Sequence, residues 1–162
     1  MKYDEQEFVK QIAMHEGLRL EVYQDHLGID TIGIGRNLED RGITDEELEI
    51  MDMDMDMVYE NGITEADAYM LCKNDINIVV CELLGAFPVV EDLSAARQRV
   101  VVDMGFNMGI PRLSKFKNMW AAIEQEDYTW ASEEMMDSRW ADQVGRRANR
   151  LSHTMKTGEW HV

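Results

Sequence analysis

Proline, cysteine and long hydrophobic runs are all scarce in this sequence. Proline and cysteine occur twice each in 162 residues, and no apolar run reaches the roughly 18 residues that a membrane-spanning helix needs. The opening MKYDEQEFVKQI also lacks the apolar stretch of a secretory signal. With no repeat and no flexible linker, we expect one domain over residues 1–162, made in the cytoplasm without a cleaved leader or a membrane span.

The two cysteines, Cys72 and Cys81, lie nine positions apart in a segment with helical periodicity. Nine residues of helix rise about 13 Å, whereas a disulfide needs Cα atoms within about 7 Å of each other. We therefore expect two reduced cysteines that act as packing residues. The same separation excludes them as a pair of metal ligands.

Basic residues are few, with 16 Lys and Arg against 32 Asp and Glu, a formal net charge of −16. Residues 1–96 hold six basic and 23 acidic residues, and residues 97–162 hold ten and nine. The excess of acid therefore lies almost wholly in the first half. Nucleic-acid binding needs basic surface, so this charge disfavours a nucleic-acid partner and is typical of a well-solvated surface.

Hydrophobic periodicity predicts an α+β, mostly helical chain. A short helix opens the chain, and residues 18–35 alternate around HLGI as a β-hairpin does. Thr44 and Thr64 each begin a helix with acids in its first turn, as N-caps do. The second of these helices is long and covers 65–84. Only helical patterns follow, with breaks at 109–111 and near 145.

Two acids and a hydroxyl are expected to converge at the mouth of the hairpin. Glu16 ends the first helix, Asp25 ends the first strand, and Thr31 begins the second. Cleavage of a glycosidic bond needs one acid to protonate the leaving oxygen, and a second, ionised group to handle water or the reacting carbon. By itself the pattern is weak, because 32 acids offer many such pairs beside turns.

Several short motifs, separated along the chain, resemble those of a known protein family. The spacing Glu-x8-Asp-x5-Thr, with EGLRL from Glu16 and TIGIG from Thr31, resembles the phage-type lysozymes, glycoside hydrolase family 24. Over nearly the whole chain, NGIT, MGFNMG, SRW and TGEW follow in the family's order. The resemblance implies a lysozyme-like two-lobed fold. Its parts are a small β-containing lobe at 15–64, a connecting helix at 65–84 and a helical lobe from 1–14 and 85–162.

The resemblance also implies an activity. The family hydrolyses the β-1,4 bond between N-acetylmuramic acid and N-acetylglucosamine in peptidoglycan, with inversion. Glu16 matches its general acid, Asp25 the carboxylate that orients or activates water, and Thr31 the hydroxyl that helps to hold that water. Inversion implies carboxyl groups about 6.5–9.5 Å apart. A monomeric endolysin is implied, without cofactor or metal, that binds glycan strands and lyses the cell wall after the membrane has been permeabilised.

Further positions carry over from the family. Those that match its substrate groove are Leu38, Phe106, Asn107 and Arg139, with Met108 as either groove or core. Arg147 matches a basic residue beside the general acid. Arg36 and Asp75 match an ion pair of structural rather than catalytic role. Asp30, before Thr31, replaces a common aromatic residue, and strand alternation places these two neighbours on opposite faces.

Two other functions stay open. The stretch MDMDMDM, residues 51–57, offers acids at loop positions 1, 3 and 5 of an EF-hand that starts at Asp52. Met57 and Ile63 then stand where such a loop needs its glycine and its bidentate glutamate, which argues against calcium binding. We expect this stretch to bend or fray, with some methionines tucked under the lobe and the aspartates in water. The second alternative is a catalytically weak lysozyme-like protein that binds glycan.

Overall fold

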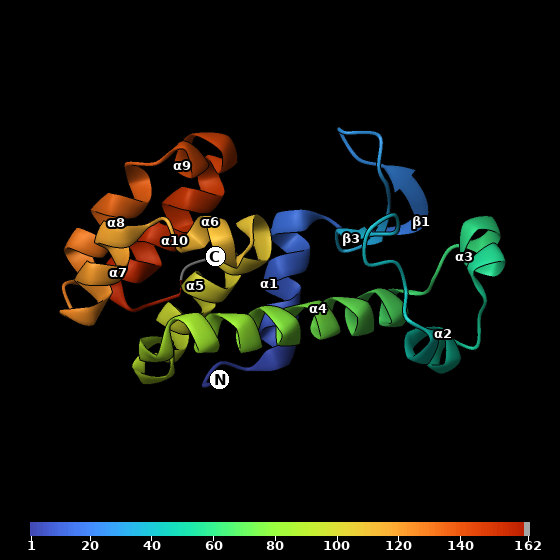
Figure 1. The fold of residues 1–162 in the computed structure, drawn as a ribbon, viewed down its shortest axis with the longest axis horizontal. Coiled ribbons are helices and arrows are strands. Elements are labelled where there is room, and N and C mark those ends of the chain that lie inside the picture. The colour runs from blue at the N-terminus through green and yellow to red at the C-terminus, as the bar shows by residue number, and fades with distance from the viewer. Residues whose placement is uncertain (161–162) are drawn as a thin grey trace. The chain divides into compact units, whose positions relative to one another are not determined.

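The computed structural model describes residues 1–160, so the last two residues of the predicted 85–162 segment lie outside the described part. The chain is mostly helical with one small sheet, the α+β class predicted (Figure 1). The strands are β1 (Arg19–Gln24), β2 (Asp30–Gly33) and β3 (Arg36–Asn37). The helices are α1 (Glu5–Glu16), α2 (Asp45–Met51), α3 (Met55–Asn61), α4 (Glu65–Ala86), the 3-10 helix η1 (Pro88–Asp92), α5 (Ala95–Met108), α6 (Ile110–Leu113), α7 (Lys117–Glu124), α8 (Tyr128–Met136), α9 (Arg139–Val144) and α10 (Arg146–Thr157).

The chain divides into two units. The N-terminal unit is Glu5–Asp75, and the C-terminal unit combines Met1–Asp4 with Ile76–Val162. The boundary between the two units falls inside α4. Helix α1 belongs to the N-terminal unit, whereas the prediction assigned residues 1–14 to the helical lobe. The lobe scheme of 15–64, 65–84 and the remainder stays a prediction.

The sheet lies in the N-terminal unit as an antiparallel order β1-β2-β3. The predicted hairpin is formed by β1 and β2, with Tyr23 opposite Thr31 and Gln24 opposite Asp30. Gly28 closes the loop at φ +78 and donates its N–H to the carbonyl of Asp25 at 2.9 Å. A residue with a left-handed backbone at this place is typical of a three-residue hairpin loop.

Helix starts follow the predicted capping chemistry. The Thr44 hydroxyl accepts the N–H of Glu47 at 3.1 Å, while the Glu47 carboxylate accepts the N–H of Thr44 at 3.0 Å. Thr64 and Asp67 make the same reciprocal pair, both at 3.1 Å, before α4. Each box satisfies backbone donors that a helix start leaves open.

The stretch MDMDMDM is the junction between α2 and α3. Asp52 follows α2 with a left-handed backbone at φ 54, and Asp54 caps α3 by accepting the N–H of Met57 at 2.9 Å. The predicted bend is therefore confirmed, and two of the three aspartates cause it.

The methionines of this stretch divide by burial. Met51, Met53 and Met55 are half-buried and pack on the core of the unit, while Met57 is exposed. That core comprises Ile32, Val58, Ile63, Ala68 and Leu71. Helix α2 ends at Met51 and α3 begins at Met55, so no single helix runs through the stretch, and its aspartates are exposed while Met51, Met53 and Met55 are half-buried.

The cysteines are free: Cys72 is buried and Cys81 is exposed. Burial raises the pKa of the Cys72 thiol to about 12. The prediction of two unbridged cysteines is confirmed. The prediction that Cys81 is a packing residue is wrong, because its side chain is exposed on α4. None of the helices within residues 1–160 has the length and apolar character required to cross a membrane.

The C-terminal unit is a helical assembly in which α8 packs against both α7 and α10, and α5 against α6 and α10 (Figure 1). The predicted breaks are confirmed, at Gly109 between α5 and α6 and at Gly145 between α9 and α10. Phe87 stacks on Trp120 with ring centroids 3.8 Å apart.

Candidate active site

Glu16 is the last residue of α1 and is half-buried. Gly17 follows at φ +85 and donates its N–H to the carbonyl of Ala13 at 2.8 Å. This left-handed glycine ends the helix and turns the chain into β1, as the sequence predicted. The turn places Glu16 three residues before the first strand of the hairpin.

Asp25 lies where β1 runs into the hairpin loop. Its Oδ1 accepts two backbone N–H groups, from Leu27 at 2.8 Å and from Ile29 at 3.0 Å. The N–H of Ile29, and then that of Leu27, lower the pKa of Asp25 because both bonds favour the charged carboxylate. Asp25 is therefore ionised at neutral pH, and its Oδ2 is left to meet other groups.

Thr31 is buried, with 5% of its surface exposed. Its hydroxyl donates to the carbonyl of Ile29 at 2.9 Å. A hydroxyl carries one proton, so the remaining capacity of Thr31 is to accept a hydrogen bond. Ile29 thus orients both polar groups, by donating to Asp25 and accepting from Thr31.

The hairpin register brings the predicted residues together. Tyr23 pairs with Thr31, and the N–H of Asp25 donates to Ile29 at 3.0 Å in the same register. Tyr23, Thr31 and Asp25 therefore share one face, with Asp25 diagonal to Thr31 at a typical Cα separation of about 7–8 Å. Glu16 also interacts with this group of residues, since its negative charge, like that of Asp25, raises the pKa of the Tyr23 phenol.

Sequence reasoning missed Tyr23. Burial raises the pKa of its phenol, and the carboxylates of Glu16 and Asp25 raise it further, while Arg19 lowers it. The available signal was strand alternation, since Tyr23 stands two residues before Asp25 on the predicted first strand. The cross-strand pairing to Thr31 required the register.

Asp30 is held away from this face, as alternation predicted. Its Oδ2 accepts the hydroxyl of Tyr59 at 2.9 Å, and its N–H donates to Glu39 at 2.6 Å. The hydrogen bond to Asp30 raises the pKa of Tyr59. Leu38, a predicted groove residue, is half-buried and packs against the core of the N-terminal unit.

The predicted ion pair of Arg36 and Asp75 is present, with Nε and Oδ2 at 3.0 Å. Arg36 also makes a two-pronged contact to Glu47, at 2.8 and 2.9 Å, and both side chains are buried. Arg41 is a second partner of Asp75. Burial opposes ionisation of Glu47, but hydrogen bonds from Arg36, Asn74 and the N–H of Thr44 hold its pKa well below the usual range.

The other predicted residues belong to the C-terminal unit. Phe106 is half-buried on α5, Met108 is buried in the core, and Arg139 is exposed at the start of α9. Asn107 Oδ1 accepts the indole N–H of Trp140 at 2.7 Å, so its amide group is oriented by the protein. Glu16, Asp25 and Thr31 are all in the N-terminal unit.

Arg147 is buried in the C-terminal unit, where its Nε donates to Asp103 at 2.8 Å. Asp103 is fully buried. The sequence contained no signal for this pair, because its members lie 44 positions apart. The buried Asp103 supplies the opposite charge that a buried guanidinium needs.

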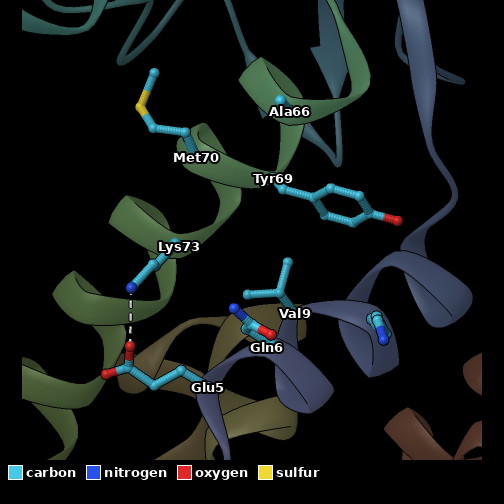
Figure 2. Close-up of a pocket in the computed structure, with 8 residues that line it drawn as sticks. Glu5, Gln6, Val9, Ala66, Tyr69, Met70 and Lys73 are labelled. Carbon is cyan, nitrogen blue, oxygen red and sulfur yellow. Dashed lines mark ion pairs between the residues drawn. The ribbon is translucent and has the colours of Figure 1, made fainter. Parts of the chain in front are cut away.

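A separate groove of about 450 Å³ lies between α1 and α4 of the N-terminal unit (Figure 2). Glu5 and Lys73 form an ion pair across it at 2.9 Å, and Tyr69 extends into it from α4. The groove contains none of the predicted site residues. Within residues 1–160, no three His, Cys, Asp or Glu side chains are grouped closely enough to hold a metal ion.

The chain as a whole is similar in sequence to known proteins. Residues 13–155 match the family model described as phage lysozyme. Two Dictyostelium discoideum proteins, named probable T4-type lysozyme 1 and 2, are 28% and 26% identical over 152 residues, covering 88% of this chain and 89% of each relative. The pre-baseplate central spike protein Gp5 of Enterobacteria phage T4 is 29% identical over 151 residues, which cover 88% of this chain and 26% of that protein.

Proposed function

The chain belongs to the phage lysozyme family and is thus a lysozyme-like glycosidase, and we propose that it hydrolyses the β-1,4 bond between N-acetylmuramic acid and N-acetylglucosamine in peptidoglycan. The observation that supports this most is the hairpin that joins Asp25 and Thr31 on one face, with Glu16 at the helix end that leads into it. We propose that the enzyme acts as a monomeric endolysin on the glycan strands of the bacterial wall.

Each group has a role that its contacts support. Glu16, half-buried at the end of α1, is the proposed general acid that protonates the leaving oxygen. Asp25 is the proposed base, because two backbone N–H bonds keep it ionised. Such a division of labour between one protonated and one ionised carboxyl is what glycosidic hydrolysis needs.

The water that attacks the sugar would be oriented by two acceptors. The hydroxyl proton of Thr31 is used by Ile29, and Oδ1 of Asp25 is used by two N–H groups. A water that donates its two protons to Thr31 Oγ1 and Asp25 Oδ2 turns a lone pair toward the anomeric carbon. Asp25 then accepts one proton as the carbon–oxygen bond forms. We propose that this attack inverts the anomeric configuration.

Replacing Glu16 by glutamine tests the proposal. We expect Glu16→Gln to abolish lysis, because the amide cannot donate a proton to the leaving oxygen. Lysis is measured as loss of turbidity of permeabilised Gram-negative cells, and the fold by thermal unfolding. Glu60→Gln, the same change at an exposed position of α3, serves as the control. Full lytic activity of Glu16→Gln would contradict the assignment of Glu16 as the general acid. Inversion is tested separately, by NMR analysis of the anomer that is released.

A further inference from the structure

Strand β1 contains a β-bulge between Arg19 and Tyr23, just before the residues that face the proposed catalytic site. Arg19 pairs with Gly33 and Tyr23 with Thr31, so three residues of β1 stand opposite one residue of β2. Such bulges redirect the side chains that follow them and are common beside active sites.

The bulge is held in place by a contact from outside the sheet. The carbonyl of Leu20 accepts the N–H of Ile63 at 2.8 Å. Gly62 lies against the same carbonyl, and a Cβ there would come within 2.3 Å of the Leu20 oxygen. With φ +73, Gly62 also has a backbone that favours glycine. The bulge is therefore a fixed part of the N-terminal unit.

A hollow runs along the bulged segment, and Tyr23 is one of its lining residues. Residues Leu18–Tyr23 line an open hollow of about 430 Å³. The guanidinium carbon of Arg19 lies 4.3 Å from the centre of the Tyr23 ring. This cation–π contact orients the ring, while the register places Tyr23 opposite Thr31.

The phenol of Tyr23 is available for a ligand. Tyr23 is half-buried, and among residues 1–160 its hydroxyl has no hydrogen-bond partner. Its pKa is raised, chiefly by burial, so the group is neutral at physiological pH and can both donate and accept.

We propose that Tyr23 is a substrate-binding residue, whose hydroxyl makes a hydrogen bond to a polar oxygen of the glycan at the sugar beside the cleaved bond. This inference rests on the proposed function. It follows from the position of Tyr23, which shares a face with Thr31 and Asp25 and also lines the hollow. Arg19 sets the orientation of the ring and is a positioning residue.

The test removes only the hydroxyl. We expect Tyr23→Phe to lower kcat/KM on purified peptidoglycan about tenfold, as loss of one hydrogen bond does. Tyr69→Phe makes the same change in the groove between α1 and α4 and should leave kcat/KM unchanged (Figure 2). Equal kcat/KM for Tyr23→Phe and the parent enzyme would overturn the proposal.

A binding measurement separates contact from indirect effects. In the Glu16→Gln background, adding Tyr23→Phe should raise the dissociation constant for a soluble peptidoglycan fragment about tenfold by calorimetry. If the dissociation constant for the fragment is unchanged while the rate is reduced, Tyr23 acts only through other groups. That result would overturn the proposed hydrogen bond between its hydroxyl and the glycan. If the parent enzyme binds the fragment but does not cut it, the proposed hydrolysis fails, while the binding arm still tests Tyr23.

Discussion

At the scale of single residues, the buried Arg36 is the centre of a cluster of ion pairs and hydrogen bonds. The guanidinium contacts the carboxylates of Glu47 and Asp75 and the carbonyls of Leu71 and Gly42. Five N–H donors in a rigid fork allow arginine to satisfy several acceptors at once. The cluster ties β3 to α2 and α4, and both helices contribute residues that pack in the core of the N-terminal unit.

Replacing Glu47 by glutamine should therefore destabilise the protein. We expect Glu47→Gln to lower the free energy of unfolding by about 3 kcal/mol, because it leaves the buried Arg36 charge with less compensation. Urea unfolding measures this. Glu46→Gln, at the exposed neighbouring position, should change it by less than about 0.5 kcal/mol. An equal, small effect of both substitutions would contradict the interpretation of the cluster.

The pH dependence has a definite sign. The folded pKa of Glu47 lies below its ordinary value of 4.5, so the stabilisation is fully present above about pH 4.5 and is lost as pH falls through the folded pKa. The difference in unfolding free energy between the parent protein and Glu47→Gln should thus shrink below pH 4.5.

At the scale of elements, the junction between α2 and α3 shows how one repetitive stretch serves three purposes. Asp52 adopts the left-handed turn, Asp54 caps α3, and Asp56 lies in the first turn of that helix. The intervening methionines cover the core of the unit. The alternation therefore has a structural role in this junction.

The aspartates of the junction should differ in their contribution to stability. We expect Asp54→Ala to cost about 1 kcal/mol, because the N–H of Met57 loses its cap. Asp56→Ala should be nearly neutral, since the gain in helix propensity offsets the lost dipole interaction. Chemical denaturation of both variants checks this. A larger cost at Asp56 than at Asp54 would contradict the cap assignment.

At the scale of the whole molecule, charge is divided between the units. The N-terminal unit holds five Lys or Arg and nineteen Asp or Glu, a net −14 of the total −16. The proposed catalytic residues are in that unit. An anionic wall would repel it over the Debye length, which is about 30 Å at 0.01 M salt and about 8 Å at 0.15 M.

Lysis should therefore depend on salt in a biphasic way. We expect the lytic rate to rise between low and moderate sodium chloride, as the repulsion is screened, and to fall at higher concentrations. Turbidity assays over this range measure the rate, and cosedimentation of Glu16→Gln with cell walls measures adsorption alone. A steady fall of the lytic rate from the lowest salt would refute the role of repulsion.

The predictions that the structure confirms depend on neighbours in sequence. The hairpin, the Thr44 and Thr64 caps and the end of α1 at Gly17 each follow from a few adjacent residues. The separation of the two cysteines also depended only on helical rise. The exposure of Cys81 could not be predicted from helical rise, because it depends on which face of α4 the rest of the chain covers.

The sequence by itself determined the fold class, the family and the local placement of Glu16, Asp25 and Thr31, because helix ends and hairpins are specified by short-range chemistry. Only the tertiary structure decided the partners: Tyr23 for Thr31, Glu47 for Arg36, and Asp103 for Arg147. Cross-strand register depends on a bulge held by the distant Gly62 and Ile63. Ion pairs 11 and 44 positions apart form only when packing brings their elements together.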